Sequence, residues 1–307
     1  MKWVSFIAVL ALGVVLGVVC SSVPKDKFFK KSPEQPLFTV TEHKPFVIIV
    51  PSYNNSEWAE RNLRSIFTQK YDNYRVVYID DASQDGTLKI VKDFLALHQM
   101  EHRFEIVHNE LNRGACENIY KTIHRCSEDE IAVILDGDDW FAHDRVLERL
   151  NEIYADSNVW LTYGSYVEYP SYSYTVANFA KELPEKIVNK NRVRDYSRQN
   201  WCLSHLRTFY VSLYKRIKES DFLMDGKYLS AANDLAVMIP LVEMAGKHAK
   251  YVKEVFYIYN RATPLNDNKV RAKRQQETAN YIFNLPKYPS LASLEKTNVR
   301  NHETVKN

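Results

Sequence analysis

Residues 131–140 have the sequence IAVILDGDDW, in which an apolar run leads directly into three carboxylates, Asp136, Asp138 and Asp139. The run is short and apolar, which predicts a buried strand. Because unpaired acids are costly to bury, we expect the carboxylates at the exposed carboxyl end of that strand, holding a cation. Mg²⁺ and Mn²⁺ take such oxygen ligands and commonly bridge to phosphates. The alternative is an ordinary acidic turn, since Asp and Gly are common turn residues.

The first half of the chain alternates apolar runs with amphipathic stretches. The runs predict strands over 46–50, 75–79, 104–107 and 131–135, and the stretches between them predict helices that begin near 56, 85 and 115. Repeated strand–helix units predict an α/β fold with a mostly parallel sheet flanked by helices. In the second half we expect strands over 159–164 and 250–259 and a helix over 233–246.

Polar residues follow each of the four strands in the first half, at 51–54, 80–83, 112–114 and 136–139. Ligands of parallel sheets bind at the carboxyl ends of the strands, so we expect a binding site along this edge. The dinucleotide fingerprint G-x-G-x-x-G and the phosphate-binding loop G-x-x-x-x-G-K-[ST] are absent from the sequence. A metal held by the acids could neutralise phosphates in their place, which favours a nucleoside diphosphate as the ligand.

These blocks resemble the glycosyltransferases of family 2, which have the GT-A fold. The matching stretches are Ile49–Asn54, Asp80–Thr87, Asn112–Gly114 and Leu135–Asp139, all within residues 47–164. The resemblance implies a Rossmann-like nucleotide-diphospho-sugar transferase. It also implies a nucleotide-sugar donor, most often UDP-linked, with Mn²⁺ or Mg²⁺ as the cofactor.

The same resemblance assigns roles to individual residues. It implies that the donor nucleotide is contacted by Pro51, Tyr53, Asp81, Asn112 and Asp136, and the metal by Asp138 and Asp139. Alternatives stay open for some members of the blocks. Tyr53 could only pack, Asp80 could be structural beside Asp81, and Asp85 is expected to cap the helix that follows it.

The base catalyst is expected at the start of the helix over 233–246. Inverting sugar transfer needs a carboxylate that takes the proton of the acceptor hydroxyl as it attacks C1 of the donor. Asp234 would lie at a helix N-terminus, where the helix dipole favours its ionised form. The resemblance agrees, because family 2 enzymes place their base as the Asp of a Glu-Asp pair at a helix start; here the pair is Asn233-Asp234. The alternative is that both residues only cap the helix.

Three further residues could contact the diphosphate or the acceptor: His205, Arg207 and Arg261. Arg207 suits a charge contact to the leaving phosphate, whereas an isolated His is more often structural. In many relatives a Tyr-Arg-x-His run supplies a metal-binding His. Here the run at residues 259–262 is YNRA, so the third metal ligand is not identified and Arg261 could meet the diphosphate instead.

The composition argues against several other classes. Charged residues at 26% and a net charge of +3 are ordinary for a globular domain and too small to indicate a nucleic-acid partner. The four cysteines have no metal-ligand spacing and do not form a disulfide scaffold.

The N-terminus differs from the rest of the chain. Residues 3–20 carry no charge, so residues 1–22 are expected to be a membrane anchor or a signal peptide, followed by a linker over 23–44. If the segment is retained, the lysines after it favour a membrane-associated protein with a cytoplasmic catalytic domain; if it is cleaved, the protein is exported. The only N-x-[ST] acceptor, Asn54-Asn55-Ser56, falls in the expected donor loop, which favours a compartment without N-glycosylation.

We therefore expect a nucleotide-sugar-binding half over 45–165, an acceptor and catalytic half over 166–265, and a helical tail over 266–307. The expected function is metal-dependent, inverting transfer of a sugar to a hydroxyl of a carbohydrate, lipid or protein acceptor. One rival is a catalytically silent nucleotide-sugar-binding protein, because Asn233 and Ala262 depart from the family pattern. The other is a sugar nucleotidyltransferase, but its glycine- and lysine-rich first loop is missing.

Overall fold

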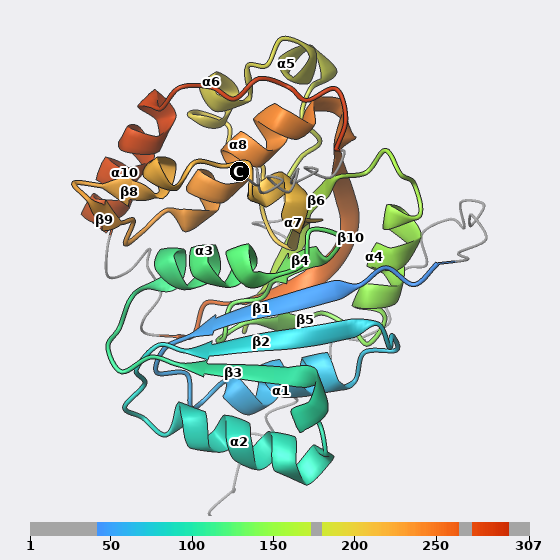
Figure 1. Cartoon of the computed structure of the whole chain (residues 1–307), viewed down its shortest axis with the longest axis vertical. Coiled ribbons are helices and arrows are strands. Elements are labelled where there is room, and N and C mark those ends of the chain that lie inside the picture. Colours follow the sequence, from blue (N-terminus) through green and yellow to red (C-terminus); the bar gives the residue numbers. More distant parts are fainter. Residues whose placement is uncertain (1–41, 173–179, 264–271, 295–307) are drawn as a thin grey trace, which may run out of the picture. The chain divides into compact units, whose positions relative to one another are not determined.

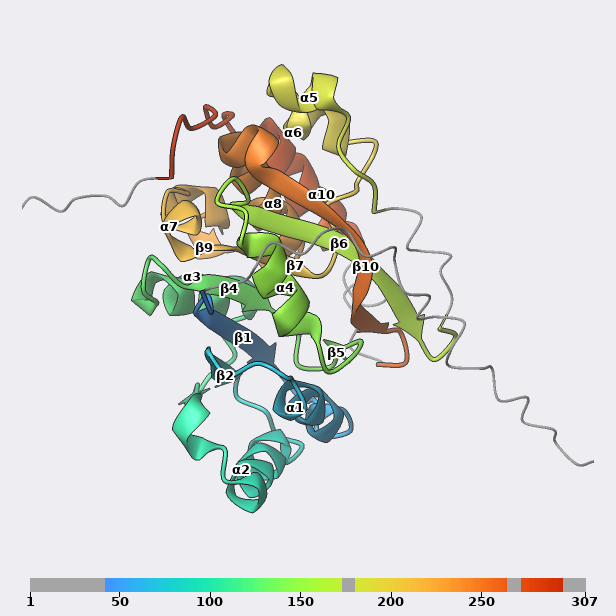
Figure 2. The ribbon, with the colours of Figure 1, turned by 90° about the vertical axis from the view of Figure 1, so that its right-hand side faces the viewer.

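The core of the fold is an eight-stranded sheet with helices packed on both faces (Figures 1 and 2). The computed structural model describes residues 42–172, 180–263 and 272–294. The strands of the sheet are β1 (Phe46–Ser52), β2 (Tyr74–Asp80), β3 (Phe104–His108), β4 (Ile131–Ile134), β5 (Trp140–Phe141), β6 (Leu161–Tyr169), β7 (Arg207–Tyr210) and β10 (Ala249–Asn260). The helices are α1 (Ala59–Phe67), α2 (Thr87–His98), α3 (Ala115–Arg125), α4 (Val146–Tyr154), α5 (Glu185–Asn189), α6 (Val193–Ser197), α7 (Val211–Tyr214), α8 (Asn233–Ala245) and α10 (Ala272–Asn284). A separate small hairpin joins β8 (Leu223–Met224) to β9 (Lys227–Tyr228).

The strand order in the sheet is β3-β2-β1-β4-β7-β6-β10-β5. The strands from β3 to β4 pair in parallel, as do β6 and β10, whereas β7 and β5 run antiparallel to their neighbours. This arrangement confirms the α/β fold with a mostly parallel sheet. Ser52 lies opposite Asp80, and Asp80 lies opposite His108, so the polar residues after these strands share one edge of the sheet.

The first strand is apolar along its whole length because both faces of the sheet are covered. Val47 and Ile49 belong to the core that includes α3 and α8. Phe46, Ile48 and Val50 belong to a second core on the opposite face, which includes α1, α2 and α4. Figure 1 shows α1 and α2 on one side of the first strands and α3 on the other.

The predicted strands and helices are present, with ends that differ by a few residues. The strands β5 and β7 were not predicted. The first is only two residues long and is defined by antiparallel pairing with β10, which is far away in sequence and leaves no local pattern. The helix predicted to begin near 56 begins at Ala59 without a side-chain cap, and the N–H of Ser56 donates to Asp85 at 2.8 Å.

The expected anchor or signal over 1–22 lies outside the described residues, as do most of the linker and the last residues of the tail. Within the described ranges no helix combines the length and the apolar character needed to cross a bilayer.

Candidate active site

One cavity brings the predicted site residues together. It has a volume of about 1030 Å³ and lies where β1, β2 and β4 end, reaching the first turn of α8. It is lined by all eleven residues that we expected to act on the donor, the metal or the acceptor: Pro51, Tyr53, Asp81, Asn112, Asp136, Asp138, Asp139, His205, Arg207, Asp234 and Arg261. Their common location supports the predicted site, while the role of each residue stays a prediction.

The acidic turn after β4 is held tightly against β1. The N–H of Gly137 donates to the carbonyl of Pro51 at 3.0 Å. A Cβ atom on Gly137 would come within 2.6 Å of both the Cβ and the Oγ of Ser52, so only glycine fits at this position. From α1, the buried amide of Asn62 donates to the carbonyls of Asp136 at 3.1 Å and Asp139 at 2.8 Å. Contacts from β1 and from Asn62 of α1 to the backbone of the turn therefore fix the position of the acids.

The Asp139 carboxylate points into the protein rather than into open solvent. Its side chain is buried, with Oδ1 accepting the N–H of Asn260 at 2.6 Å and Oδ2 accepting the Tyr257 hydroxyl at 2.6 Å. Burial, followed by the charges of Asp138 and Asp136, raises the pKa of Asp139 well above its ordinary value. Asn260 also donates its amide to the carbonyl of Asp138 at 3.1 Å, so β10 is bonded to both Asp138 and Asp139.

Asp136 lies at the meeting point of several charged groups. About a third of its side chain is exposed to the cavity, with Oδ2 3.3 Å from the Tyr257 hydroxyl and 3.8 Å from a guanidinium nitrogen of Arg207. Burial raises the pKa of Asp136. The positive charge of Arg207 and the hydrogen bond from Tyr257 oppose this rise, and the negative charge of Asp234 adds to it. The charge of Asp234 thus acts on Asp136 across the cavity.

Next to Asp136, the cationic guanidinium of Arg207 pairs with the neutral imidazole of His205. Arg207 is buried and donates to Nδ1 of His205 at 3.0 Å, and the imidazole stacks on Tyr257 with ring centroids 4.4 Å apart. Burial and the positive charge of Arg207 hold the pKa of His205 well below its ordinary value. His205 is therefore neutral at pH 7 and acts as an acceptor that orients Arg207.

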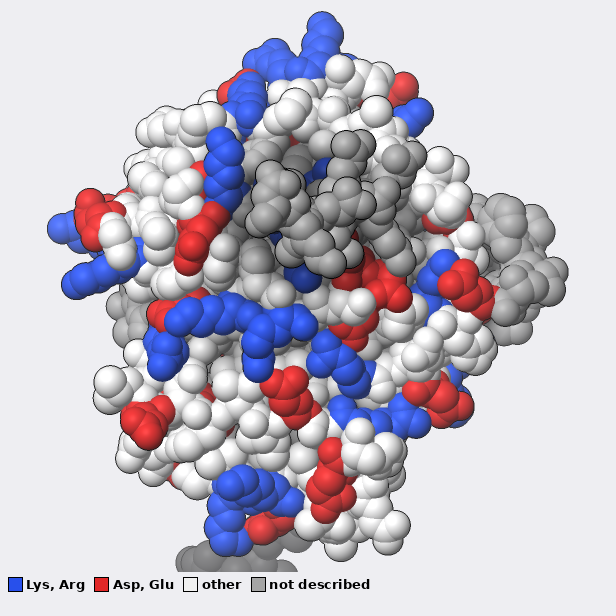
Figure 3. All heavy atoms as spheres, in the orientation of Figure 1, with Lys and Arg blue, Asp and Glu red and all other residues white. Residues whose placement is uncertain are grey.

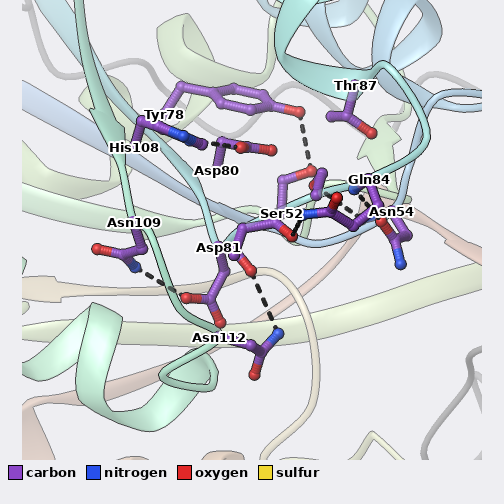
Figure 4. Close-up of polar contacts among 12 residues, drawn as sticks. Ser52, Asn54, Tyr78, Asp80, Asp81, Gln84, Thr87, His108, Asn109 and Asn112 are labelled. Carbon is purple, nitrogen blue, oxygen red and sulfur yellow. Dashed lines mark hydrogen bonds and ion pairs between the residues drawn. The ribbon is translucent and has the colours of Figure 1, made fainter.

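Where β2 ends at the cavity, Asp81 organises the loop that follows β3 (Figure 4). Its Oδ1 accepts bonds from the Asn109 amide at 2.8 Å and the Arg113 N–H at 2.9 Å, and its Oδ2 accepts the N–H of Gly114 at 2.8 Å. A carboxylate offers about four acceptor sites, so one stays available toward the cavity. The amide of Asn112 donates to the backbone carbonyl of Asp81 at 3.3 Å.

Asp80 differs from its neighbour in position and partners. It is fully buried, does not line the cavity, and places Oδ2 2.9 Å from Nδ1 of His108 (Figure 4). This geometry fits the alternative in which Asp80 is structural and Asp81 faces the ligand.

The loops after β1 and β2 are tied together by side chains. Asn54 accepts the N–H of Gln84 at 2.8 Å and donates its own N–H to Ser83 at 2.9 Å (Figure 4). Asp85 accepts the N–H of Thr87 at 3.1 Å. Burial acts against it, but hydrogen bonds from Thr87 and Ser56 lower the pKa of Asp85 overall. The cap position of α2 is Gly86 rather than Asp85, but Asp85 still accepts the N–H of the first helical residue, Thr87.

Asp234 lies in the first turn of α8, which begins at Asn233. The residue before the helix, Ala232, has a φ of 54° and makes no side-chain cap bond. Asp234 thus lies at the N-terminus of α8, where it lines the cavity. On the neighbouring strand end, Arg261 places Nε 3.6 Å from Oε1 of Glu168 and also lines the cavity.

A divalent cation fits the oxygen donors at this site. Asp136 and Asp138 offer carboxylates along the cavity, whereas both oxygens of Asp139 are already bonded to the protein. Among the described residues, no three His, Cys, Asp or Glu side chains converge to hold a metal by themselves. Mg²⁺ commonly uses one or two carboxylates together with substrate phosphates, so a site completed by a diphosphate suits this donor set.

Three residues that position the acids were not predicted from the sequence: Asn62, Tyr257 and Asn260. Tyr257 and Asn260 belong to a strand whose alternating pattern indicates only burial. These two residues lie over 100 positions from the turn that they contact, and Asn62 lies 74 and 77 positions from its partners, so no local spacing could have identified the three.

The charges on the outer surface are mixed. On the face shown in Figure 3, Lys and Arg side chains lie among Asp and Glu side chains rather than forming one basic field. This mixture agrees with the small net charge of +3.

A family model and several known proteins match large parts of the sheet and the cavity described above. The family model described as Glycosyl transferase family 2 matches residues 47–216. TuaG of Bacillus subtilis (strain 168), a glycosyltransferase named for teichuronic acid biosynthesis, is 30% identical over 112 residues, which make up 36% of this chain and 43% of TuaG. The match thus spans less than half of that relative's length.

Solved structures share the fold at low sequence identity. S. aureus TarS 1-349 in complex with UDP-GlcNAc has a TM-score of 0.57 at 16% identity, covering 78% of this chain and 67% of that chain. Mannosyltransferase PcManGT from Pyrobaculum calidifontis, in complex with GDP-Man and Mn²⁺, has a TM-score of 0.53 at 22% identity, covering 74% of this chain and 59% of that chain.

Proposed function

The chain belongs to glycosyl transferase family 2, and from this premise we propose that it transfers one sugar, with inversion and with a divalent metal, from a nucleotide-diphosphate donor to an acceptor hydroxyl. The observation that carries the proposal is the single cavity in which the polar ends of the parallel strands meet Asp234. The complexes of TarS with UDP-GlcNAc and of PcManGT with GDP-Man and Mn²⁺ support a nucleotide sugar and a divalent cation as ligands.

The donor nucleotide is held by the loops after β1, β2 and β3. Asp81 fixes the loop at 109–114 and keeps an acceptor site for the base, while Pro51 and Tyr53 pack against the base and ribose. Asp136 serves the ribose or the metal, and Asp138 is the first candidate for a direct metal ligand. Asp139 holds the turn, because both of its oxygens are bonded to Tyr257 and Asn260.

In the transfer step, Asp234 accepts the proton of the acceptor hydroxyl as the hydroxyl oxygen bonds to C1 of the sugar. The bond from C1 to the diphosphate oxygen breaks on the opposite side, and its electron pair leaves with the nucleoside diphosphate. A bound metal would neutralise the negative charge that grows on this leaving group. Arg207 and Arg261, which line the same cavity, would stabilise that charge from the protein side.

The test is donor turnover across UDP-, GDP- and dTDP-sugars with Mn²⁺, Mg²⁺ or EDTA, with NMR assignment of the product anomer. We expect one nucleotide class to be turned over only with metal, and the product anomer to be opposite to that of the donor. Asp138→Asn should abolish metal-dependent turnover, whereas Asp93→Asn, the same change on the exposed face of α2, should not. Donor binding without turnover in any condition would favour a silent binding protein, and retention of configuration would contradict the inverting step.

A further inference from the structure

The cavity is lined by two sets of residues, of which one contains acids and the other, among the described residues, contains none. The donor set contains the acids Asp81, Asp136, Asp138 and Asp139. The other set comes from residues 181, 196–204 and α10; among its described members there is no acid. It carries two cations and three aromatic side chains: Lys181, Arg198, Tyr196, Trp201 and Phe283. We call this second set the basic–aromatic wall.

The basic–aromatic wall is anchored by a buried ion pair. From α6, Arg194 donates to both carboxylate oxygens of Glu243 on α8, each at 2.9 Å, and to the carbonyl of Ile282 on α10 at 2.6 Å. Arg194 is 2% exposed and Glu243 1%. A bidentate pair of this kind has a defined geometry, so it holds together the helices that carry Tyr196 and Phe283 of the wall.

One of the two cations of the wall, Arg198, is itself oriented. Arg198 follows α6 directly and donates to the carbonyl of Phe283 at 3.2 Å and to Oδ1 of Asn284 at 3.1 Å. Its guanidinium lies 5.1 Å from the centroid of the Phe283 ring. Lys181 is close enough to the buried Cys202 for its charge to act on that thiol. Both cations line the cavity, Lys181 near Cys202 and Arg198 beside Phe283.

Resting on the proposed function, we propose that the basic–aromatic wall binds the acceptor and that the acceptor is a saccharide carrying a phosphate or carboxylate group. Arginine and lysine recognise both anions, and arginine does so with defined directions. Aromatic side chains such as Tyr196 and Trp201 offer apolar faces with a polar edge, which suits the face of a sugar ring. The donor diphosphate has Arg207, Arg261 and the acidic turn on the other set, so the cations of the wall serve a second anion.

The test uses three probes that differ at one carbon: methyl β-glucoside, its 6-phosphate and methyl β-glucuronide. Their affinities for the full chain, saturated with UDP and Mn²⁺, are measured by calorimetry or ligand-observed NMR. We expect the phosphate, the glucuronide or both to bind at least about tenfold more tightly than the neutral glucoside, which corresponds to about 1.4 kcal/mol. Comparing the two anionic probes identifies which anion the wall prefers.

Variants locate the effect. Lys181→Gln and Arg198→Gln should remove the preference for the anionic probe while leaving the affinity for the neutral probe and the donor KM within about twofold. Lys186→Gln and Lys190→Gln make the same charge change on the exposed part of the same segment, outside the cavity, and should leave the preference intact. Because surface charge interactions are screened by salt, the preference should also fall as ionic strength rises.

Equal affinity for the three probes, no affinity for any of them, or a raised donor KM in Lys181→Gln and Arg198→Gln would overturn the inference alone. Absence of donor turnover under every metal condition would instead remove the proposed function and, with it, the premise of an acceptor site. Donor turnover is measured in water without any acceptor, so the two failures are told apart.

Discussion

The hydroxyl of Tyr257 donates a hydrogen bond to Oδ2 of Asp139 at 2.6 Å, across 118 positions of the chain. The same hydroxyl accepts the N–H of Asp136 at 3.4 Å and lies 3.3 Å from its carboxylate. Tyr257 is fully buried, and its ring supports His205. The strand β10 therefore sets the orientation of the acidic turn that we propose as part of the donor site.

Tyr257→Phe removes this hydroxyl and keeps the ring. Leaving the buried Asp139 oxygen without its donor should lower the free energy of unfolding by about 1–3 kcal/mol. Because outer groups orient metal ligands, the Mn²⁺ concentration for half-maximal donor turnover should rise by about tenfold. Tyr251→Phe is the control: it lies on the same strand and its hydroxyl bonds to Ser165 at 2.9 Å. Urea unfolding and metal titration give both quantities, and an equal metal response in the two variants would contradict this role.

Adjacent aspartates after β2 should respond differently to one change. Asp81→Asn replaces a carboxylate that accepts three hydrogen bonds with an amide, in which one oxygen accepts and the NH₂ group donates. Weaker bonds in the loop and to the base should reduce the free energy of donor binding by about 1–3 kcal/mol. This loss should raise the donor KM by about 5- to 100-fold. Asp80→Asn, which changes a residue outside the cavity, should leave the donor KM within about twofold of wild type. Steady-state kinetics measure the donor KM of both variants. A similar rise in KM for Asp81→Asn and Asp80→Asn would show that the loop, not Asp81, limits donor binding.

Gly137→Ala should disturb the acidic turn directly. The added Cβ would meet Ser52 at 2.6 Å and the Asn55 amide at 2.9 Å, so the turn must move away from β1, at about 1–3 kcal/mol. Donor turnover should fall as the acids shift. Gly226→Ala is the control, because its strain comes from a φ of +74° in open space and should cost about 1 kcal/mol without affecting turnover. Unchanged turnover in Gly137→Ala would mean that the site tolerates displacement of the turn.

His205 should make the fold less stable in mild acid. Its pKa is held well below the ordinary value by burial and by Arg207, so below about pH 6.5 the unfolded chain binds a proton that the folded chain does not. Stability contributed by the neutral imidazole is present above that pH and is lost as the pH falls toward the folded pKa. The loss is at most about 1.4 kcal/mol per pH unit.

Urea unfolding at pH 7.5 and pH 5.5 measures this contribution. His205→Gln, whose side-chain oxygen can still accept a bond from Arg207, should lose less stability than wild type between the two pH values. His102→Gln, an exposed replacement, should behave as wild type. An identical pH response in His205→Gln and wild type would show that His205 titrates normally.

The parts of the site that follow local patterns were predictable from the sequence. Asp81, Asp136 and Asp138 come directly after apolar runs, and parallel strands bring such ends together. Asp234 was located by a polar pair at the start of an apolar helix. Both inferences depend on residues within a few positions of each other.

The supporting contacts were not predictable, because they depend on pairing between distant segments. Tyr257 and Asn260 reach the acidic turn only because β10 pairs with β5, directly after that turn. The basic–aromatic wall comes from residues 181 and 196–204, which have little periodicity, and it is positioned by the Arg194–Glu243 pair. Neither contact leaves a spacing in the sequence, since each joins elements far apart in the chain.

The most direct test of the central claim is to compare donor binding and sugar transfer in Asp234→Asn and wild type. Removal of a general base typically costs about 10²- to 10⁴-fold in rate, so we expect transfer to fall by at least that lower limit while the donor Kd stays within about twofold. Loss of turnover with intact binding would place Asp234 at the chemical step. Transfer at the wild-type rate in Asp234→Asn would contradict the account, because no carboxylate at the start of α8 would then be needed to accept the proton.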